Sequence, residues 1–129
     1  MLEINNKVAL VVCSNGKARE DKIKLDKLEE ILKSLGLVPV YSNYLYKDKF
    51  GKSASAEIRS EELMNFFSDK SIKAIFDISG GDLSNEILDY LDYDIIKKNI
   101  KLFFGYSDLS VVLNAITVKT ENLHIYTKY

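Results

Sequence analysis

Residues 8–13, Val8-Ala-Leu-Val-Val-Cys13, form the apolar run from which the fold of this 129-residue chain can be argued. The run is short, continuous and rich in β-branched side chains, which is typical of a parallel strand covered on both faces. Strands of this kind are joined through helices, and a helical pattern follows after a short turn. The run therefore predicts an α/β fold.

The segments beyond this run alternate between helix and strand patterns. Segment 21–35 has five apolar residues on one helical face: Leu25, Leu28, Ile31, Leu32 and Leu35. Gly36 follows directly and can end a helix. Apolar runs predict further strands at 37–41, 72–78 and 101–105, and one more around 123–126. Helical patterns cover 56–69, 82–91, 92–98 and 107–116, whereas 42–55 has the composition of a loop. This order predicts a mostly parallel sheet with helices on both faces, a flavodoxin-like three-layer domain.

The composition excludes several functional classes. With 18 Lys and Arg against 19 Asp and Glu, the chain has no excess positive charge for nucleic acid. No apolar stretch approaches the ~20 residues that span a membrane, and no signal sequence is evident. Cys13 is the only cysteine and His124 the only histidine, so no internal disulfide and no histidine-rich metal site can form. We expect a reduced, cytoplasmic protein.

In parallel sheets of this kind, ligands bind beyond the carboxyl ends of the strands, which directs attention to three loops. Residues 14–17 contain one glycine and match no nucleotide-binding pattern, so we interpret them as a connecting turn. Gly80-Gly81 could present backbone N–H groups to an anion or an oxyanion, or could simply make a tight turn. Ser107, in Gly105-Tyr-Ser-Asp108, is either a helix cap or the serine of a nucleophile elbow.

Three stretches resemble the N-terminal domain of the L,D-carboxypeptidase family of serine peptidases. They are Ser79-Gly-Gly-Asp-Leu-Ser-Asn85, Leu88-Asp-Tyr-Leu-Asp-Tyr-Asp94 and Lys101-Leu-Phe-Phe-Gly-Tyr-Ser-Asp-Leu-Ser110. That family includes muramoyl-tetrapeptide carboxypeptidases and microcin C self-immunity peptidases. The similarity runs from Val8 to about Ile116.

The resemblance implies roles for particular residues. Ser107 corresponds to the nucleophile. The oxyanion hole would be made by the backbone amides of Asp108, Gly81 and Gly80, and substrate contacts are expected from Ser79, Asp82 and Ser84. Many family members have an arginine where this chain has Ser79.

The resemblance also implies a reaction and a missing part. The substrate would be an amide bond between L- and D-residues of a peptidoglycan-type peptide, or a microcin-like peptidyl nucleotide, and the reaction needs no metal or organic cofactor. The family's glutamate and histidine lie on a C-terminal domain, so residues 1–129 correspond to the nucleophile-bearing N-terminal domain and should be nearly inactive alone. Family members are homodimers. The alternatives are a non-catalytic peptide-binding module and a self-associating α/β module.

Overall fold

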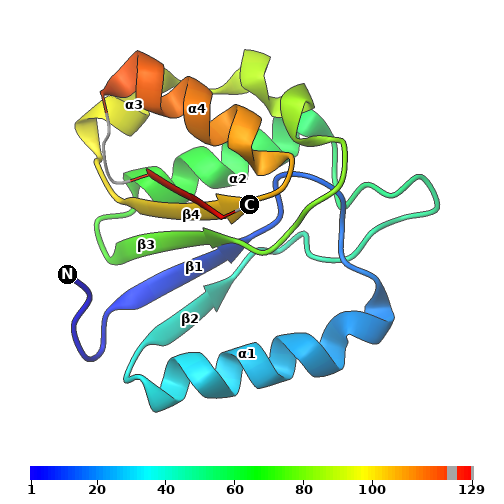
Figure 1. Cartoon of the computed structure of the whole chain (residues 1–129), viewed down its shortest axis with the longest axis vertical. Coiled ribbons are helices and arrows are strands. Elements are labelled where there is room, and N and C mark those ends of the chain that lie inside the picture. Colours follow the sequence, from blue (N-terminus) through cyan, green and yellow to red (C-terminus); the bar gives the residue numbers. More distant parts are fainter. Residues whose placement is uncertain (122–124, 129) are drawn as a thin grey trace.

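The sheet is entirely parallel in the computed structural model, which describes residues 1–121 and 125–128 (Figure 1). Within these residues five strands lie in the order β2-β1-β3-β4-β5. Their bounds are Lys7–Val11 for β1, Val38–Tyr41 for β2, Ile72–Asp77 for β3, Leu102–Tyr106 for β4 and Ile125–Lys128 for β5. This is the strand order of flavodoxin-like folds, so the predicted fold class is confirmed.

The helices lie on both sides of the sheet. They are α1 (Lys22–Ser34), α2 (Ala56–Ser68), α3 (Tyr93–Lys98) and α4 (Leu109–Thr120), with the short 3-10 helices η1 (Arg19–Asp21) and η2 (Ser84–Tyr90). Figure 1 shows α1 on one side of the strands and α2, α3 and α4 on the other. Side-chain caps fix two helix starts, because Ser55 accepts from the N–H of Ile58 and Asp92 from that of Ile95.

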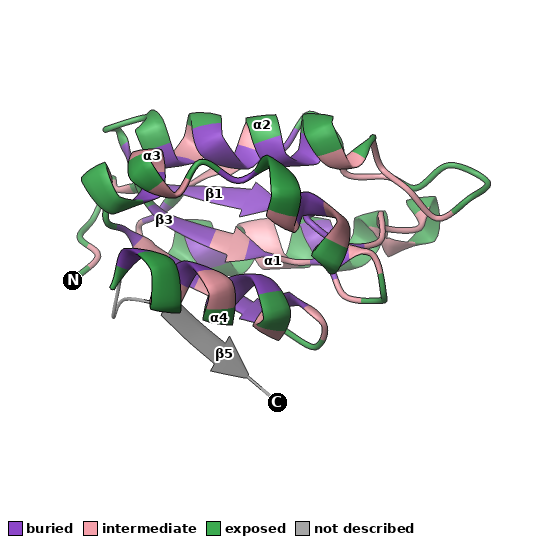
Figure 2. Ribbon diagram, turned by 90° about the horizontal axis from the view of Figure 1, so that it is seen from above, coloured by how far each residue is buried: buried purple, intermediate pink, exposed green. Residues whose placement is uncertain are grey.

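Each face of the sheet packs into its own apolar cluster. On the face of α2, α3 and α4, the rings of Phe67 and Phe103 meet edge to face with centroids 5.7 Å apart. On the face of α1, Leu10 of β1 packs with Leu32 in a smaller cluster. The colouring in Figure 2 shows β1 buried between the helices, as the apolar run 8–13 predicts.

The structure corrects one detail of the sequence prediction and sharpens two others. The segment 82–91, predicted as a helix, forms the 3-10 helix η2, and the last helix, whose apolar pattern reaches Ile116, continues to Thr120. Ile31 of α1 and Leu35, which directly follows α1, are 49% and 64% exposed, so only part of the predicted apolar face is buried. The strand predicted around 123–126 overlaps β5, but Leu123 and His124 lie outside the described residues. In the described part of the chain, no helix is both long and apolar enough to cross a bilayer.

A buried lysine joins α2 to β3. The ammonium of Lys101 donates hydrogen bonds to the carbonyls of Phe66 (2.8 Å), Ile72 (2.9 Å) and Asp69. These carbonyls belong to the end of α2, to the turn after it and to the start of β3. One side chain therefore joins backbone acceptors from three successive parts of the chain, of which the Asp69 carbonyl also accepts from the N–H of Ile72 at 3.1 Å.

Replacing Lys101 with Met should destabilise the fold by about 2 kcal/mol, because it keeps the apolar stem but removes the donor that the end of α2 and the start of β3 share. Urea unfolding followed by circular dichroism measures the change. Lys97→Met, at an exposed position of α3, is the control and should leave the unfolding midpoint nearly unchanged. Equal midpoints for the two variants would contradict this role of Lys101.

Candidate functional site

The loops after β1, β3 and β4 leave the sheet at one edge, because the three strands run parallel (Figure 1). We call them the first loop (residues 12–17), the glycine loop (residues 78–83) and the serine turn (residues 106–108). Hydrogen bonds between the loops bring most of the predicted site residues together.

The serine turn has the conformation of a nucleophile elbow. Ser107 is exposed and adopts φ +58°, a left-handed backbone that is uncommon for residues other than glycine. Helix α4 begins two residues later, with Asp108 as its N-cap. A side chain at position 105 would come within 3.1 Å of the Leu109 side chain, so the turn needs the glycine that precedes the serine by two positions. The chain therefore presents Ser107 at a sharp strand-to-helix turn.

The glycine loop lies against Ser107. A methyl group built on Gly80 would be 3.9 Å from the Ser107 hydroxyl oxygen and 3.5 Å from the ring of Tyr106. No described residue accepts a hydrogen bond from the N–H groups of Gly80, Gly81 or Asp108. The predicted nucleophile and the predicted oxyanion donors are thus neighbours in the structure.

Asn15 of the first loop fixes the path of the glycine loop. Its side-chain oxygen accepts from the N–H of Asp82 at 3.1 Å. Gly81 has φ +133°, and a methyl group there would come within 2.3 Å of the same side chain. The loop after β1 is therefore more than the connecting turn that the sequence suggested.

The carboxylate of Asp108 joins the serine turn to the first loop and to Ser84, the first residue after the glycine loop. One of its oxygens accepts from the hydroxyl of Ser14 (2.6 Å) and from the N–H of Ser84 (3.0 Å). In return, the hydroxyl of Ser84 donates to the Asp108 carbonyl at 2.8 Å. The side chain of Asp108 is thus directed into the protein, which leaves its backbone N–H for a ligand.

A second buried carboxylate, that of Asp77, holds the first loop to the end of β3. It accepts from the N–H of Cys13 (2.9 Å) and from the N–H of Ser79 (2.8 Å), and the Ser79 hydroxyl donates to it as well. Burial raises the pKa of Asp77, and hydrogen bonds from Ser79 and Cys13 oppose that rise. Burial also raises the pKa of the Cys13 thiol, which disfavours the reactive thiolate form.

These contacts separate the three residues that were expected to touch substrate. Ser79 and Ser84 are buried, and their hydroxyls bond to Asp77 and Asp108. Asp82 is exposed on the glycine loop. The structure therefore places Ser79 and Ser84 in the framework of the site, and only Asp82 has its side chain in a position to meet a ligand.

The sequence analysis missed Arg59, which α2 places beneath the site at 2% exposure. Its guanidinium donates to the carbonyls of Cys13 (2.6 Å) and Ser14 (3.3 Å) in the first loop, and of Leu83 (3.3 Å) in the glycine loop. It also pairs with Glu86 at 2.7 Å. No short motif marks this residue, since its partners are 24–46 positions away.

No general base reaches the serine within the described residues. No described carboxylate accepts a hydrogen bond from the Ser107 hydroxyl, and His124 lies outside the described part of the chain. The described residues also contain no cluster of His, Cys, Asp or Glu that could hold a metal ion. The described part of the chain thus provides a serine and hydrogen-bond donors, and none of its carboxylates is hydrogen-bonded to that serine.

Comparisons with known proteins agree with this geometry. A profile of the LD-carboxypeptidase N-terminal domain, Peptidase S66, matches residues 8–127. A putative carboxypeptidase of Treponema pallidum is 34% identical over 120 residues, which are 93% of this chain and 36% of that protein. The chain thus spans about a third of that relative's length.

Two solved structures have the same fold. An MccF-like protein from Bacillus anthracis superposes with a TM-score of 0.90 at 31% identity, over 98% of this chain and 38% of that one. The microcin C7 self-immunity protein MccF in complex with aspartyl sulfamoyl adenosine superposes with a TM-score of 0.86 at 29% identity, over 93% of this chain and 36% of that one. A protein of that name from Escherichia coli is 34% identical over 97 residues, which are 75% of this chain and 28% of that protein.

Gly81→Ala should disrupt the glycine loop and lower the free energy of unfolding by about 1–3 kcal/mol, because alanine resists this backbone conformation and its methyl group would overlap Asn15. Gly80→Ala is the matched control, since Gly80 has no positive φ and its added methyl group would make only ordinary contacts. Thermal unfolding of both variants measures the difference. A Gly81→Ala protein as stable as Gly80→Ala would show that the loop does not depend on this conformation.

Arg59→Leu should cost about 3 kcal/mol of stability, because it leaves three loop carbonyls and Glu86 without their buried donor. We expect faster amide hydrogen exchange in residues 13–17 and 79–84 than in the strands. Arg19, the other arginine of the chain, is exposed, so Arg19→Leu serves as the control. Unchanged exchange in both loops would contradict the role given to Arg59.

Proposed function

The chain belongs to the LD-carboxypeptidase family, Peptidase S66, and from this we propose that it is the nucleophile-bearing domain of a serine carboxypeptidase. One observation carries the proposal: Ser107 stands exposed at a positive-φ turn, beside two glycines whose N–H groups bond to no described residue. A structural helix cap would not require this strained conformation.

The proposed mechanism begins with attack of the Ser107 hydroxyl oxygen on the substrate carbonyl carbon. The backbone N–H groups of Asp108, Gly80 and Gly81 would stabilise the negative charge that develops on the carbonyl oxygen, and each such donor typically contributes about 10²–10³ in rate. The scissile C–N bond then breaks, the leaving amine takes up a proton, and water hydrolyses the acyl-serine ester.

The serine proton needs an acceptor, which in this family we expect from the histidine and glutamate of a C-terminal domain. A serine hydroxyl without a base is a weak nucleophile, so residues 1–129 alone should have little activity. Cys13 is buried and unpaired, which supports a reducing, cytoplasmic setting. We also propose that the full-length protein forms a homodimer, as the family resemblance implies.

We propose an amide bond between an L- and a D-residue of a peptidoglycan-type peptide as the substrate, which the family's description supports. The aspartyl sulfamoyl adenosine in the MccF complex supports a second class, the acyl-sulfamoyl nucleotides. The lack of a described base favours one alternative function, a module that binds a peptide carboxylate at the free N–H groups without cleaving it.

A chimera tests the proposal, in which this chain replaces the matched N-terminal part of the Bacillus anthracis relative. We expect it to hydrolyse either an L,D-tetrapeptide ending in D-alanine or aspartyl sulfamoyl adenosine. Ser107→Ala should lower turnover by about a thousandfold or more, whereas Ser34→Ala, on the exposed surface of α1, should not change it.

The isolated 129-residue chain completes the experiment and should show no turnover above buffer. A folded chimera that binds either compound without cleaving it would support the binding module instead. Turnover by the isolated chain that is lost in Ser107→Ala would mean that these residues supply a base, which would contradict the proposed inactivity.

A further inference from the structure

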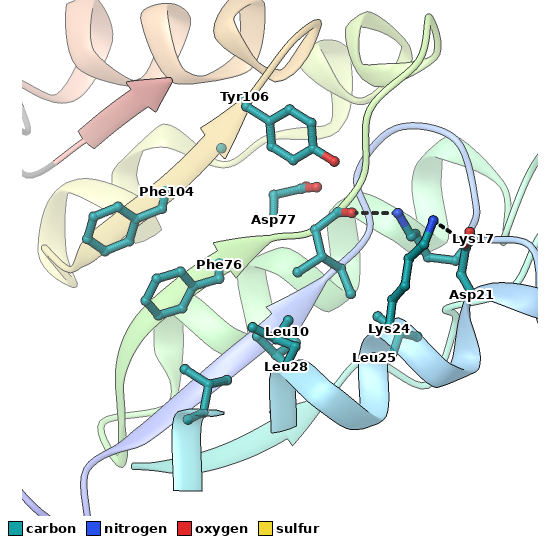
Figure 3. A pocket seen from close by; sticks show the side chains of 13 residues that line it. Leu10, Lys17, Asp21, Lys24, Leu25, Leu28, Phe76, Asp77, Phe104 and Tyr106 are labelled. Carbon is teal, nitrogen blue, oxygen red and sulfur yellow. Dashed lines mark hydrogen bonds and ion pairs between the residues drawn. The ribbon is translucent and has the colours of Figure 1, made fainter. Parts of the chain in front are cut away.

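The face of the sheet that carries α1 contains a cavity of about 550 Å³ (Figure 3). Phe76 of β3 and Phe104 and Tyr106 of β4 form its floor, and Leu25 and Leu28 of α1 form its wall. Figure 3 shows Leu28 across the cavity from Phe76 and Phe104. We call this cavity and the apolar surface around it the α1 groove.

The groove exists because α1 covers only part of the sheet face on which it lies. Among the described residues only α1 and the short η1 that leads into it lie on this side, and α1 lies over β1 and β2 (Figure 1). The rings of Phe76 and Phe104 stack with centroids 4.7 Å apart, and both are only partly buried. Parallel strands are normally covered on both faces, whereas these rings of β3 and β4 keep part of their surface exposed.

One flank of α1 is apolar without a partner. Ile31 and Leu35, which are 49% and 64% exposed, follow Leu28 at helical spacing. Leu28 lines the groove, so the same flank of the helix turns toward it. Ile23, at 81% exposure, lies on the opposite flank. An apolar strip therefore runs along α1 and continues onto the floor formed by β3 and β4.

We propose that the α1 groove receives an amphipathic α-helix, which the longer family members carry in the chain after the position of β5. A strip between a helix and a sheet floor is the surface into which such a helix lays its apolar face. The Treponema and Bacillus anthracis relatives have the chain to supply it, because the matched N-terminal part is only 36% and 38% of their lengths. Strand β5 pairs with β4, so chain that leaves β5 starts beside the groove.

The charges at the groove mouth indicate how this helix is oriented. Lys17 donates to the Ile78 carbonyl at 3.1 Å, and Lys24 pairs with Asp21 at 3.3 Å (Figure 3). Two ammonium groups thus lie near the Asp21 carboxylate, while Asp77, the other acidic residue that lines the cavity, is buried. The mouth lies toward the carboxyl edge of the sheet, where a helix that follows β5 would begin. Acidic residues in its first turn would complement both the lysines and the helix dipole.

The test extends this chain beyond Tyr129 with the segment of about thirty residues that follows the matched part of the Bacillus anthracis relative, enough for a link and a helix as long as α1. A scrambled extension of the same composition is the control. We expect the native extension to raise the urea midpoint and to lower the fluorescence of a bound apolar dye at least about twofold, because it covers the groove.

Variants in and directly after α1 locate the docking site. Each variant is compared with and without the extension. Ile31→Asp combined with Leu35→Asp should abolish both effects of the extension, whereas Ile23→Asp on the opposite flank should preserve them. An extension without effect, or an effect that the double variant retains, would overturn the proposal. A dimer of the unextended chain that the double variant dissociates would also overturn it, since a second copy would then fill the groove.

Discussion

Backbone carbonyls at the end of a buried parallel strand must find donors, and in this protein the Arg59 guanidinium supplies them. It donates to Cys13 and Ser14 after β1 and to Leu83 in the glycine loop, from a position with almost no access to water. Because guanidinium is planar and always charged, one side chain sets the spacing of two loops. The arrangement of the candidate site depends on this contact.

The carboxylate of Asp108 adds the third loop to this framework. It bonds to Ser14 and Ser84, and it follows directly after Ser107, whose left-handed backbone is costly for a serine. A strained residue persists only where the surrounding contacts over-determine its conformation. The turn is held in this way from both sides, since Gly105 lets β4 approach α4 closely and Asp108 bonds to the neighbouring loops.

Local patterns in the sequence were sufficient to predict the fold and the loops that form the candidate site. The apolar run 8–13 and the helical spacing of 21–35 depend on neighbours a few residues apart, and Gly80-Gly81 and Ser107 mark turns by their own residue types. Arg59 and Ser14 could not be found in this way, because Ser14 meets Asp108 across 94 positions. The exposure of Ile31 and Leu35 could not be predicted either, because spacing identifies an apolar face but not how much of it the sheet covers.

The partly exposed sheet face and the candidate site meet at Tyr106. Its ring lines the α1 groove and also lies 3.5 Å from the position that a methyl group on Gly80 would occupy, and the next residue is Ser107. A helix seated in the groove would pack against this ring and restrict both the end of β4 and the glycine loop. In that case a segment that packs on one face of the sheet would also make Ser107 and the glycine loop more rigid, without contributing a catalytic group.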